Sequence, residues 1–414
     1  MSRGLIRNTP VLLSAVVTLL AMPGCSMGTS CKTMCPAEVN PSDDVSAGEA
    51  DPLASQSIAR THRPSDLTLT VDELELLSFV PDQQLIQVME ALLRAGDNKP
   101  EIIAVLDNLS FKYWESAIFL IANMSDPDLK SLSSEFLIEN IMLAHDAWEN
   151  SPWGEQVTQE HFLQYILPYA TFDERRDSWR ADFYAQLREE CWKFDDPIDA
   201  TNWLNDHLND QFRVYFDAVK RAKPDQSPYE SIEVGYASCT GLSILLTDAC
   251  RAVGIPARIV GVLQWKQVRG NHNWVEVFGD RWYNVGGTNS DTRDDDWVND
   301  RCLTQTDPDS WRHAVYAACY APTATHFPLI WDMNIRSVPA KNVTRFYSEP
   351  VEATIPVPSL GPAEVRVYWA DELVARKQVR AGESEVAFRL GGSMSYRVVI
   401  IDEDGTEHES QLDL

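Results

Sequence analysis

The sequence predicts an α+β protein whose first part is helical and whose last part is built from strands. Residues from about 66 to 153 repeat apolar side chains at the spacing of one helix face. Between residues 239 and 285, one amphipathic helix is followed by strands with alternating apolar side chains. After Val351, short strand-like runs are separated by glycine-containing turns. We therefore expect a helical module, a mixed core and a small β-sandwich, in that order.

The size and charge of the chain exclude some classes of function. Its 414 residues are 44% hydrophobic, which is enough to bury a sizeable core. With 35 Lys and Arg residues against 62 Asp and Glu residues, the formal net charge is -27. Such a surface repels polyanions, so we expect no nucleic-acid partner. Composition does not indicate the oligomeric state.

The first residues have the pattern of a secretory signal. Arg3 and Arg7 precede an apolar run over residues 11–22 that is too short to span a bilayer. The run ends at Met22-Pro23-Gly24-Cys25, which resembles the bacterial lipobox, in which the cysteine is lipidated and becomes the mature N-terminus. We expect a signal peptide over 1–24 and lipidation of Cys25, with plain secretion as the alternative. The protein would then lie in the bacterial cell envelope, periplasmic or at the outer surface, and would meet the membrane only through its lipid.

Composition also divides the rest of the chain. Residues 25–64 are poor in large apolar side chains, which predicts a flexible tether. A helical N-terminal module is expected over 65–155, where His145 falls among apolar residues and is expected to pack in the core; the same is expected of His161 just beyond. The catalytic core is expected over 156–345. A β-sandwich of immunoglobulin-like type is expected over 350–414, with no visible chemistry of its own.

Eight cysteines occur in the chain. If Cys25 carries lipid and Cys239 is a nucleophile, the pairing of the others cannot be deduced from their positions. No cysteine and histidine spacing matches a zinc motif, so we expect no metal site.

Cys239 is expected to open the central helix. Leu242, Leu245 and Leu246 share one face of this helix, and Gly254 and Pro256 end it. In a first helical turn, unpaired amides and the helix dipole favour a thiolate and can stabilise an oxyanion. On the helix pattern alone, a cysteine buried as a small apolar residue is the alternative.

His272 begins an alternating strand about thirty residues later, within Asn271-His272-Asn273-Trp274-Val275-Glu276-Val277. From a strand start, an imidazole can reach a helix N-terminus, accept the thiol proton and later protonate a leaving amine. A turn at Gly279-Asp280 returns the chain as the strand Arg281-Trp282-Tyr283. The combination of the two residues predicts a cysteine nucleophile with a histidine base.

These motifs, together with Ala237-Ser238-Cys239-Thr240-Gly241-Leu242 and Ala252-Val253-Gly254-Ile255-Pro256-Ala257-Arg258, resemble the transglutaminase-like superfamily. The chain resembles most closely its bacterial exported branch, which has a helical prefix and a β-sandwich suffix. The resemblance implies a papain-like α+β core, a cysteine nucleophile, a histidine base and an acidic third residue. Trp203 lies upstream at roughly the distance at which some transglutaminases place an oxyanion-stabilising tryptophan. No cofactor is implied, because thiol acyl transfer needs none.

The third residue departs from the family pattern, which has aspartate four residues after the tryptophan of the returning strand. Here Trp282 leads to Gly286. Counting along the expected hairpin places Gly287, or with one more loop residue Gly286, opposite His272. The acid would then come from the following loop. Asp291 is the favoured candidate, Asn289 the alternative, and neither is the third possibility.

The sequence therefore predicts an extracytoplasmic cysteine-dependent hydrolase or acyl transferase, a cysteine peptidase, amidase or transglutaminase-type enzyme, that acts on peptide or glutamine-type amide bonds of a protein or peptide substrate. Hydrolysis is favoured over crosslinking, because water is the default acceptor unless a site excludes it. The rival hypothesis is a catalytically inactive binding or assembly module with the same fold. The glycine at the usual position of the acid motivates that rival.

Overall fold

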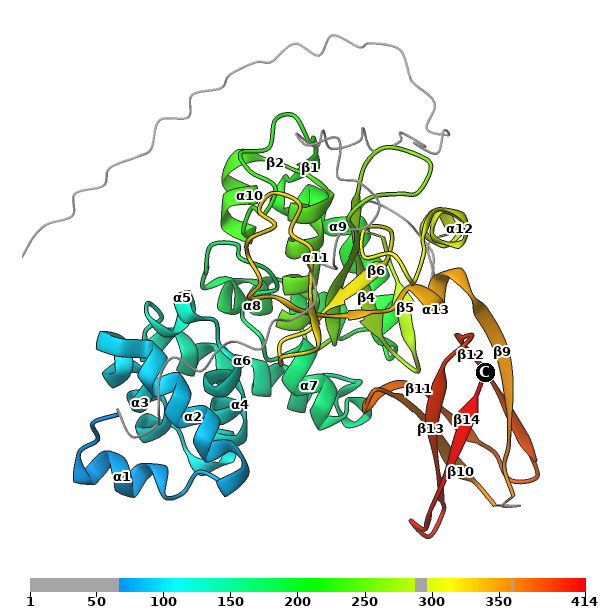
Figure 1. Ribbon diagram of the computed structural model, residues 1–414, viewed down its shortest axis with the longest axis horizontal. Coiled ribbons are helices and arrows are strands. Elements are labelled where there is room, and N and C mark those ends of the chain that lie inside the picture. The colour runs from blue at the N-terminus through cyan, green and yellow to red at the C-terminus, as the bar shows by residue number, and fades with distance from the viewer. Residues whose placement is uncertain (1–66, 287–295, 359–360) are drawn as a thin grey trace, which may run out of the picture. The chain divides into compact units, whose positions relative to one another are not determined.

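The computed structural model describes residues 67–286, 296–358 and 361–414. Its first part is helical, as predicted, and is drawn in blue and cyan in Figure 1. Its helices are α1 (Val71–Leu77), α2 (Asp82–Ala95), α3 (Lys99–Asn108), α4 (Trp114–Asn123), α5 (Asp126–Leu129) and α6 (Ser134–Asn150). Their buried faces, together with residues 162–170, form one apolar core.

Local sequence explains where these helices begin. Thr70 and Glu73 form a reciprocal capping box at α1, and the Ser133 side chain accepts a hydrogen bond from the Phe136 amide at α6. Pro100 lies in the first turn of α3, where its fixed φ is tolerated. His145 is buried on α6, where its Nε2 lies 2.8 Å from Ser116 Oγ. This confirms that His145 packs in the core.

The central part of the chain contains five more helices. They are α7 (Gln159–Tyr165), α8 (Trp179–Cys191), α9 (Pro197–Phe212), α10 (Pro228–Val234) and α11 (Cys239–Ala252). Every residue of α11 is buried. A helix buried on all sides lies inside a domain core rather than on its surface. α11 is therefore the central helix of this part.

A six-stranded antiparallel sheet lies beside α11, in the order β5-β4-β3-β6-β8-β7. Its strands are β3 (Ala257–Val262), β4 (His272–Phe278), β5 (Trp282–Asn284), β6 (Val315–Ala318), β7 (Thr325–His326) and β8 (Pro339–Asn342). Two short strands, β1 (Tyr215–Phe216) and β2 (Tyr236–Ala237), pair in parallel just before α11. The strands predicted around His272 and Trp282 are confirmed.

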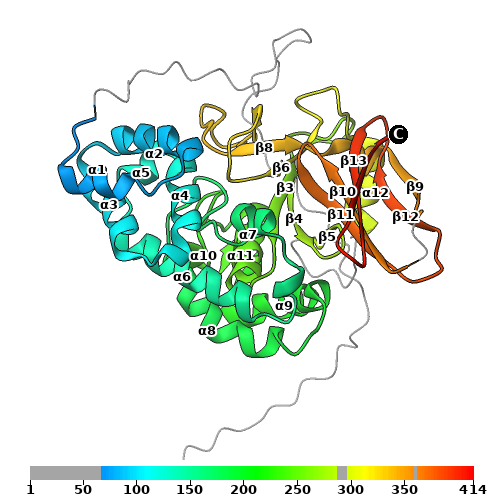
Figure 2. The same cartoon turned by 90° about the horizontal axis from the view of Figure 1, so that it is seen from below.

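The two faces of the sheet carry different layers. Val275 and Val277 of β4 pack in one apolar cluster with α11. Trp274, on the other face, packs with Val298 of α12 (Asp296–Gln305) and with Tyr347 of α13 (Thr344–Ser348). Figure 2 shows α11 and α12 on opposite sides of β3 to β5. Alternate residues of β4 therefore face different helices.

The last part of the chain consists of two antiparallel sheets that share one apolar core. One sheet has the order β11-β10-β13-β14, and the other pairs β12 with β9. The strands are β9 (Pro350–Pro356), β10 (Ala363–Trp369), β11 (Glu372–Val379), β12 (Glu385–Gly391), β13 (Ser395–Asp402) and β14 (Glu407–Asp413). Two packed sheets form a β-sandwich, as the sequence predicted.

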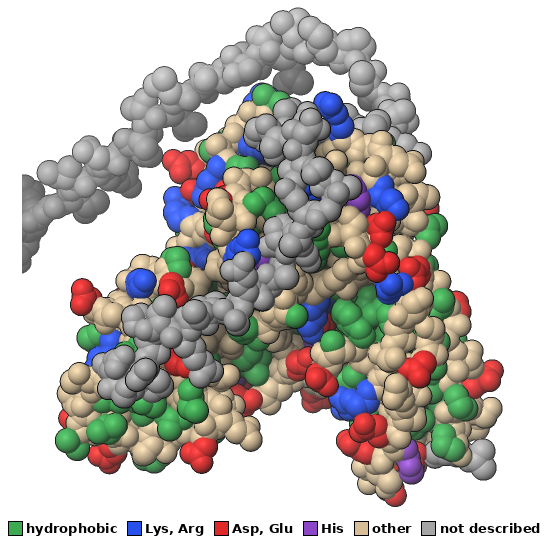
Figure 3. Space-filling model, in the orientation of Figure 1, with side chains coloured by type: hydrophobic (Ala, Val, Ile, Leu, Met, Phe, Trp, Pro, Cys, Tyr) green, Lys and Arg blue, Asp and Glu red, His purple; other side chains and the backbone are tan. Residues whose placement is uncertain are grey.

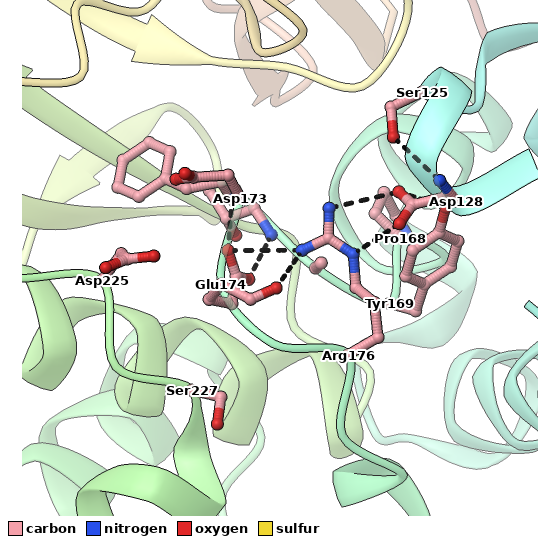
Figure 4. A network of polar contacts seen from close by, with 12 residues as sticks. Ser125, Asp128, Pro168, Tyr169, Asp173, Glu174, Arg176, Asp225 and Ser227 are labelled. Carbon is pink, nitrogen blue, oxygen red and sulfur yellow. Dashed lines mark hydrogen bonds and ion pairs between the residues drawn. The ribbon is translucent and has the colours of Figure 1, made fainter. Parts of the chain in front are cut away.

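One half-buried arginine connects the helical first part to the loop before α8. The Arg176 guanidinium binds both carboxylate oxygens of Asp128, at 2.9 and 3.1 Å, and donates to the Glu174 carbonyl oxygen (Figure 4). Asp128 also accepts a hydrogen bond from the Tyr169 hydroxyl at 3.0 Å. A bidentate pair of this kind fixes orientation as well as distance.

A second buried ion network connects the sheet to the sandwich. Between β10 and β11, Ala370 and Asp371 both adopt positive φ, and the tight turn that they form is followed at once by Glu372. Arg258 of β3 donates to Glu372 at 2.8 Å and to Glu276 of β4 at 2.7 Å. Burial opposes ionisation of Glu372, but the charges of Arg258 and Lys341 outweigh it and lower the pKa of Glu372 to about 2.

Glu372→Gln is expected to destabilise the protein by about 3–5 kcal/mol at pH 7, because it leaves a buried cation short of one partner. Since the pKa of Glu372 is lowered on folding, its contribution is complete above pH 4.5, the ordinary value, and is lost as the pH falls to about 2. Urea unfolding at pH 7 and at pH 3 measures both effects. Asp371→Asn, an exposed change in the same turn, is the control. Equal unfolding free energies for wild type and Glu372→Gln at pH 7 would contradict the role of this network.

Candidate active site

Cys239 is the first residue of α11, as predicted, and is buried. Ser238 precedes it with extended backbone, and its side chain makes no capping hydrogen bond to the helix. Instead, Ser238 Oγ donates to the Pro224 carbonyl oxygen at 3.3 Å. The side chain that most often occupies the amides of a first turn is therefore turned away from them. Such amides can stabilise negative charge on a thiolate or an oxyanion.

Gly241 allows other chain segments to approach this turn closely. A Cβ atom at Gly241 would lie 2.9 Å from the Ala237 Cβ and 3.4 Å from Ser231 Oγ. Any larger residue would push β2 and α10 away from the start of α11. The glycine of the Ser-Cys-Thr-Gly run therefore has a packing role.

One hydrogen bond joins the two elements that carry the predicted nucleophile and base. Asn273 Nδ2 donates to Thr240 Oγ1 at 2.9 Å, and both side chains are buried. Thr240 follows Cys239 in the chain and Asn273 follows His272. Gly261, paired with Asn273 across β3 and β4, makes the room, because a Cβ there would lie only 2.0 Å from Asn273 Oδ1. The start of α11 and the start of β4 therefore lie side by side.

His272 approaches from the other face of the sheet. Its ring is nearly parallel to that of Trp274, with centroids 5.9 Å apart, and meets the Trp297 ring of α12 edge to face at 5.0 Å. Asn273, by contrast, points toward α11. Because His272 is the first residue of its strand, its imidazole would have to reach round the strand end to meet the thiol. The His272 ring thus lies on the face of β4 that meets α12, and α11 lies on the other face.

The surroundings of His272 favour its neutral form. Burial, and secondarily the positive charge of Arg301 on α12, lower the pKa of the imidazole to about 4. Among the residues that the structure describes, no hydrogen-bond partner reaches His272 Nδ1. A neutral imidazole is the form that accepts a proton from a thiol.

The two candidates for the third residue, Asp291 and Asn289, lie outside the described residues. The two-residue turn is wrong, and the alternative with one more loop residue is correct. The ladder pairs Phe278 with Trp282 and Glu276 with Asn284, because Gly279, Asp280 and Arg281 form a three-residue loop in place of a two-residue turn. With this loop Gly286 does not lie opposite His272, because its carbonyl oxygen accepts a hydrogen bond from the Val275 amide at 3.4 Å, and Gly287 lies outside the described residues. Gly286 is described and has φ +63°.

Trp203, the predicted oxyanion residue, lies on α9 and is half-buried. Its ring stacks on that of His207, one turn further along the same helix, with centroids 4.5 Å apart. α9 is held to the hairpin by Asn205, whose Nδ2 donates to the Val285 carbonyl oxygen at 3.0 Å. A role for Trp203 in the site stays a prediction. Cys25, the predicted lipidation site, also lies outside the described residues.

Two residues that contact or act on His272 were not predicted, namely Trp297 and Arg301 of α12. Both lie on α12, where the only sequence signal is a short apolar spacing at Val298 and Cys302. Within the described ranges, no group of three or more His, Cys, Asp or Glu side chains is arranged to hold a metal ion.

Comparison with known proteins agrees with the motifs. Residues 187–286 match the family model of the transglutaminase-like superfamily. Among solved structures, the crystal structure of red sea bream transglutaminase matches with 10% sequence identity and a TM-score of 0.22, over 67% of this chain and 59% of that chain. The match thus spans less than two thirds of the fish enzyme. A comparison with curated proteins found no match. Residues 187–286, from the end of α8 to the end of the β4–β5 hairpin, are therefore the part of the chain that is similar to the transglutaminase-like superfamily.

Proposed function

We propose that the protein is a cysteine-dependent hydrolase or acyl transferase that acts on peptide or glutamine-type amide bonds. The Thr240–Asn273 hydrogen bond carries this proposal, because it joins the helix that starts with Cys239 to the strand that starts with His272. In the reaction, His272 takes the proton of the Cys239 thiol, and the sulfur attacks the amide carbonyl carbon. The amine leaves with a proton from His272, and water then hydrolyses the acyl-enzyme to regenerate the thiol.

The other described cysteines have no place in this chemistry. Cys191, Cys250, Cys302 and Cys319 are buried free thiols. Burial raises the pKa of all four, to about 12 for Cys250 and Cys319. Because the thiolate is the nucleophile, these cysteines are unreactive near neutral pH. The chemistry of the proposal therefore rests on Cys239.

A second function, that of a binding or assembly module without catalysis, is favoured by two observations. His272 Nδ1 has no partner among the described residues, and the position of the family aspartate is Gly286. Without an orienting group, the imidazole is not held in the tautomer and orientation that proton transfer requires. Asp291 or Asn289 would supply that group if the protein is an enzyme.

We propose an exported protein, anchored by lipid at Cys25, that works in the bacterial cell envelope. The basis is the pattern of residues 1–25.

In the part of the chain that the structure describes, no helix is long and apolar enough to cross a membrane. On the face shown in Figure 3, acidic and basic side chains are interspersed. A protein or peptide substrate is proposed on the chemistry of the thiol alone.

Thiol labelling tests whether Cys239 is activated. Iodoacetamide at pH 6 to 7, followed by peptide mapping, is expected to modify Cys239 and to leave Cys191, Cys250, Cys302 and Cys319 untouched, because their raised pKa values keep these four thiols protonated. These four are internal controls. Labelling of Cys250 or Cys319 at the rate of Cys239 would show that no activated thiolate exists.

Ammonia release from a glutamine-containing peptide tests catalysis. Wild type is expected to release ammonia with or without methylamine, since water is the expected acceptor. Cys239→Ala is expected to reduce the rate on the order of 10⁴-fold or more, as removal of a catalytic nucleophile does in related mechanisms. Cys250→Ala removes a thiol from the same helix and serves as the matched control. Equal rates for Cys239→Ala and Cys250→Ala would favour the binding module.

A further inference from the structure

The His272 ring lies against two tryptophans that meet it in different directions. Trp274 lies nearly parallel to it, at an interplanar angle of 22°. Trp297 meets it at 85°. A parallel ring limits tilting of the imidazole, and an edge-to-face ring limits its rotation about the side-chain bonds. Aromatic contacts of these two kinds are individually weak but directional.

Burial and a hydrogen bond hold the Trp274 side chain in place. It is fully buried, and its Nε1 donates to the Tyr347 hydroxyl at 3.0 Å. That hydroxyl donates in turn to the Glu276 carboxylate, which Arg258 also binds. The Trp274 ring that lies parallel to the imidazole is therefore connected to the buried ion network of the sheet.

Trp297 closes the other side and stays partly open to solvent, with 40% of its surface exposed. It meets the buried Trp265 ring edge to face at 6.4 Å. The Arg301 guanidinium, one turn further along α12, lies 5.2 Å from the Trp297 ring centroid and 5.6 Å from that of Trp265. An arginine placed in this way over two rings restrains them by cation–π attraction.

We propose that Trp297 is a positioning residue for His272, which fixes the plane of the imidazole and covers it from water. This rests on the proposed function, in which His272 is the base. Among the described residues, no hydrogen bond orients Nδ1, so ring packing does what a hydrogen bond does in other cysteine enzymes. Trp297 acts through His272 and is not itself catalytic.

Among the described residues, the charged group that acts on the imidazole is Arg301 of α12, whose charge adds to burial in lowering the pKa of His272. β3 and β4 contribute uncharged neighbours, Val262 paired with His272 and Trp274 beside it. Removing the Trp297 ring would let water reach the imidazole and raise its pKa toward the ordinary value.

Direct titration of His272 tests the proposal without requiring activity. Ring NMR signals of the full chain, assigned by their loss in His272→Gln, give the midpoint. We expect wild type to titrate near pH 4 and Trp297→Ala to shift toward the ordinary value of 6.5. Trp297→Phe should stay near wild type, because it keeps an aromatic edge. Leu303→Ala, an exposed change on the same helix, should leave the midpoint unchanged.

The rate of Cys239 alkylation against pH is the second measurement. Trp297→Ala should lower the rate at pH 7 and move the acid limb of the profile to higher pH, and Trp297→Phe should restore both. An unchanged midpoint and rate in Trp297→Ala would overturn the proposal, as would a Leu303→Ala variant that behaves like Trp297→Ala. If Cys239 proves unreactive in wild type while the NMR shifts occur as expected, the proposed function fails and the packing role of Trp297 stands.

Discussion

The rest of the fold depends on the buried guanidinium of Arg258. It joins β3 to Glu276 of β4 and to Glu372 of the sandwich, and it lies over the Trp282 ring of β5 at 3.7 Å. An isolated charge at this depth would cost several kcal/mol, so the cation and both carboxylates are stable only together. Three segments of the chain thus meet at one group. Lys341 of β8 completes the set by binding Glu372.

This network reaches the candidate site through Tyr347. Its hydroxyl connects Glu276 to the indole of Trp274, whose ring lies nearly parallel to that of His272. Arg258, Glu276 and Trp274 all belong to the runs that resemble the family. Their role here is to hold the sheet rigid beneath the base, not to take part in bond making. A motif therefore includes residues that support the chemistry as well as residues that perform it.

The sequence predicted the parts of the site that local patterns encode. Gly254, Pro256 and the apolar face of α11 identify that helix, and strand alternation identifies β4. The hairpin register stayed open between two alternatives, because composition at Gly279-Asp280-Arg281 does not distinguish a three-residue loop from a two-residue turn. Glu372 could not be assigned to the network from sequence, since it lies 114 residues from Arg258. α12 was missed because only a few of its ten residues are apolar and recur at helical spacing.

The charge state of His272 decides how the thiol can be activated. With a pKa near 4, the imidazole is neutral at pH 7, so a resting thiolate–imidazolium pair is disfavoured. The start of α11 favours a thiolate by itself, because its amides and dipole act on Cys239 without a proton having to remain on His272. Arg301 opposes imidazolium, whereas a carboxylate at Asp291 would stabilise it and an amide at Asn289 would orient the ring without adding charge. The described residues thus favour proton transfer to His272 during attack over a preformed ion pair, and a group from the loop after Gly286 would change that balance by its charge.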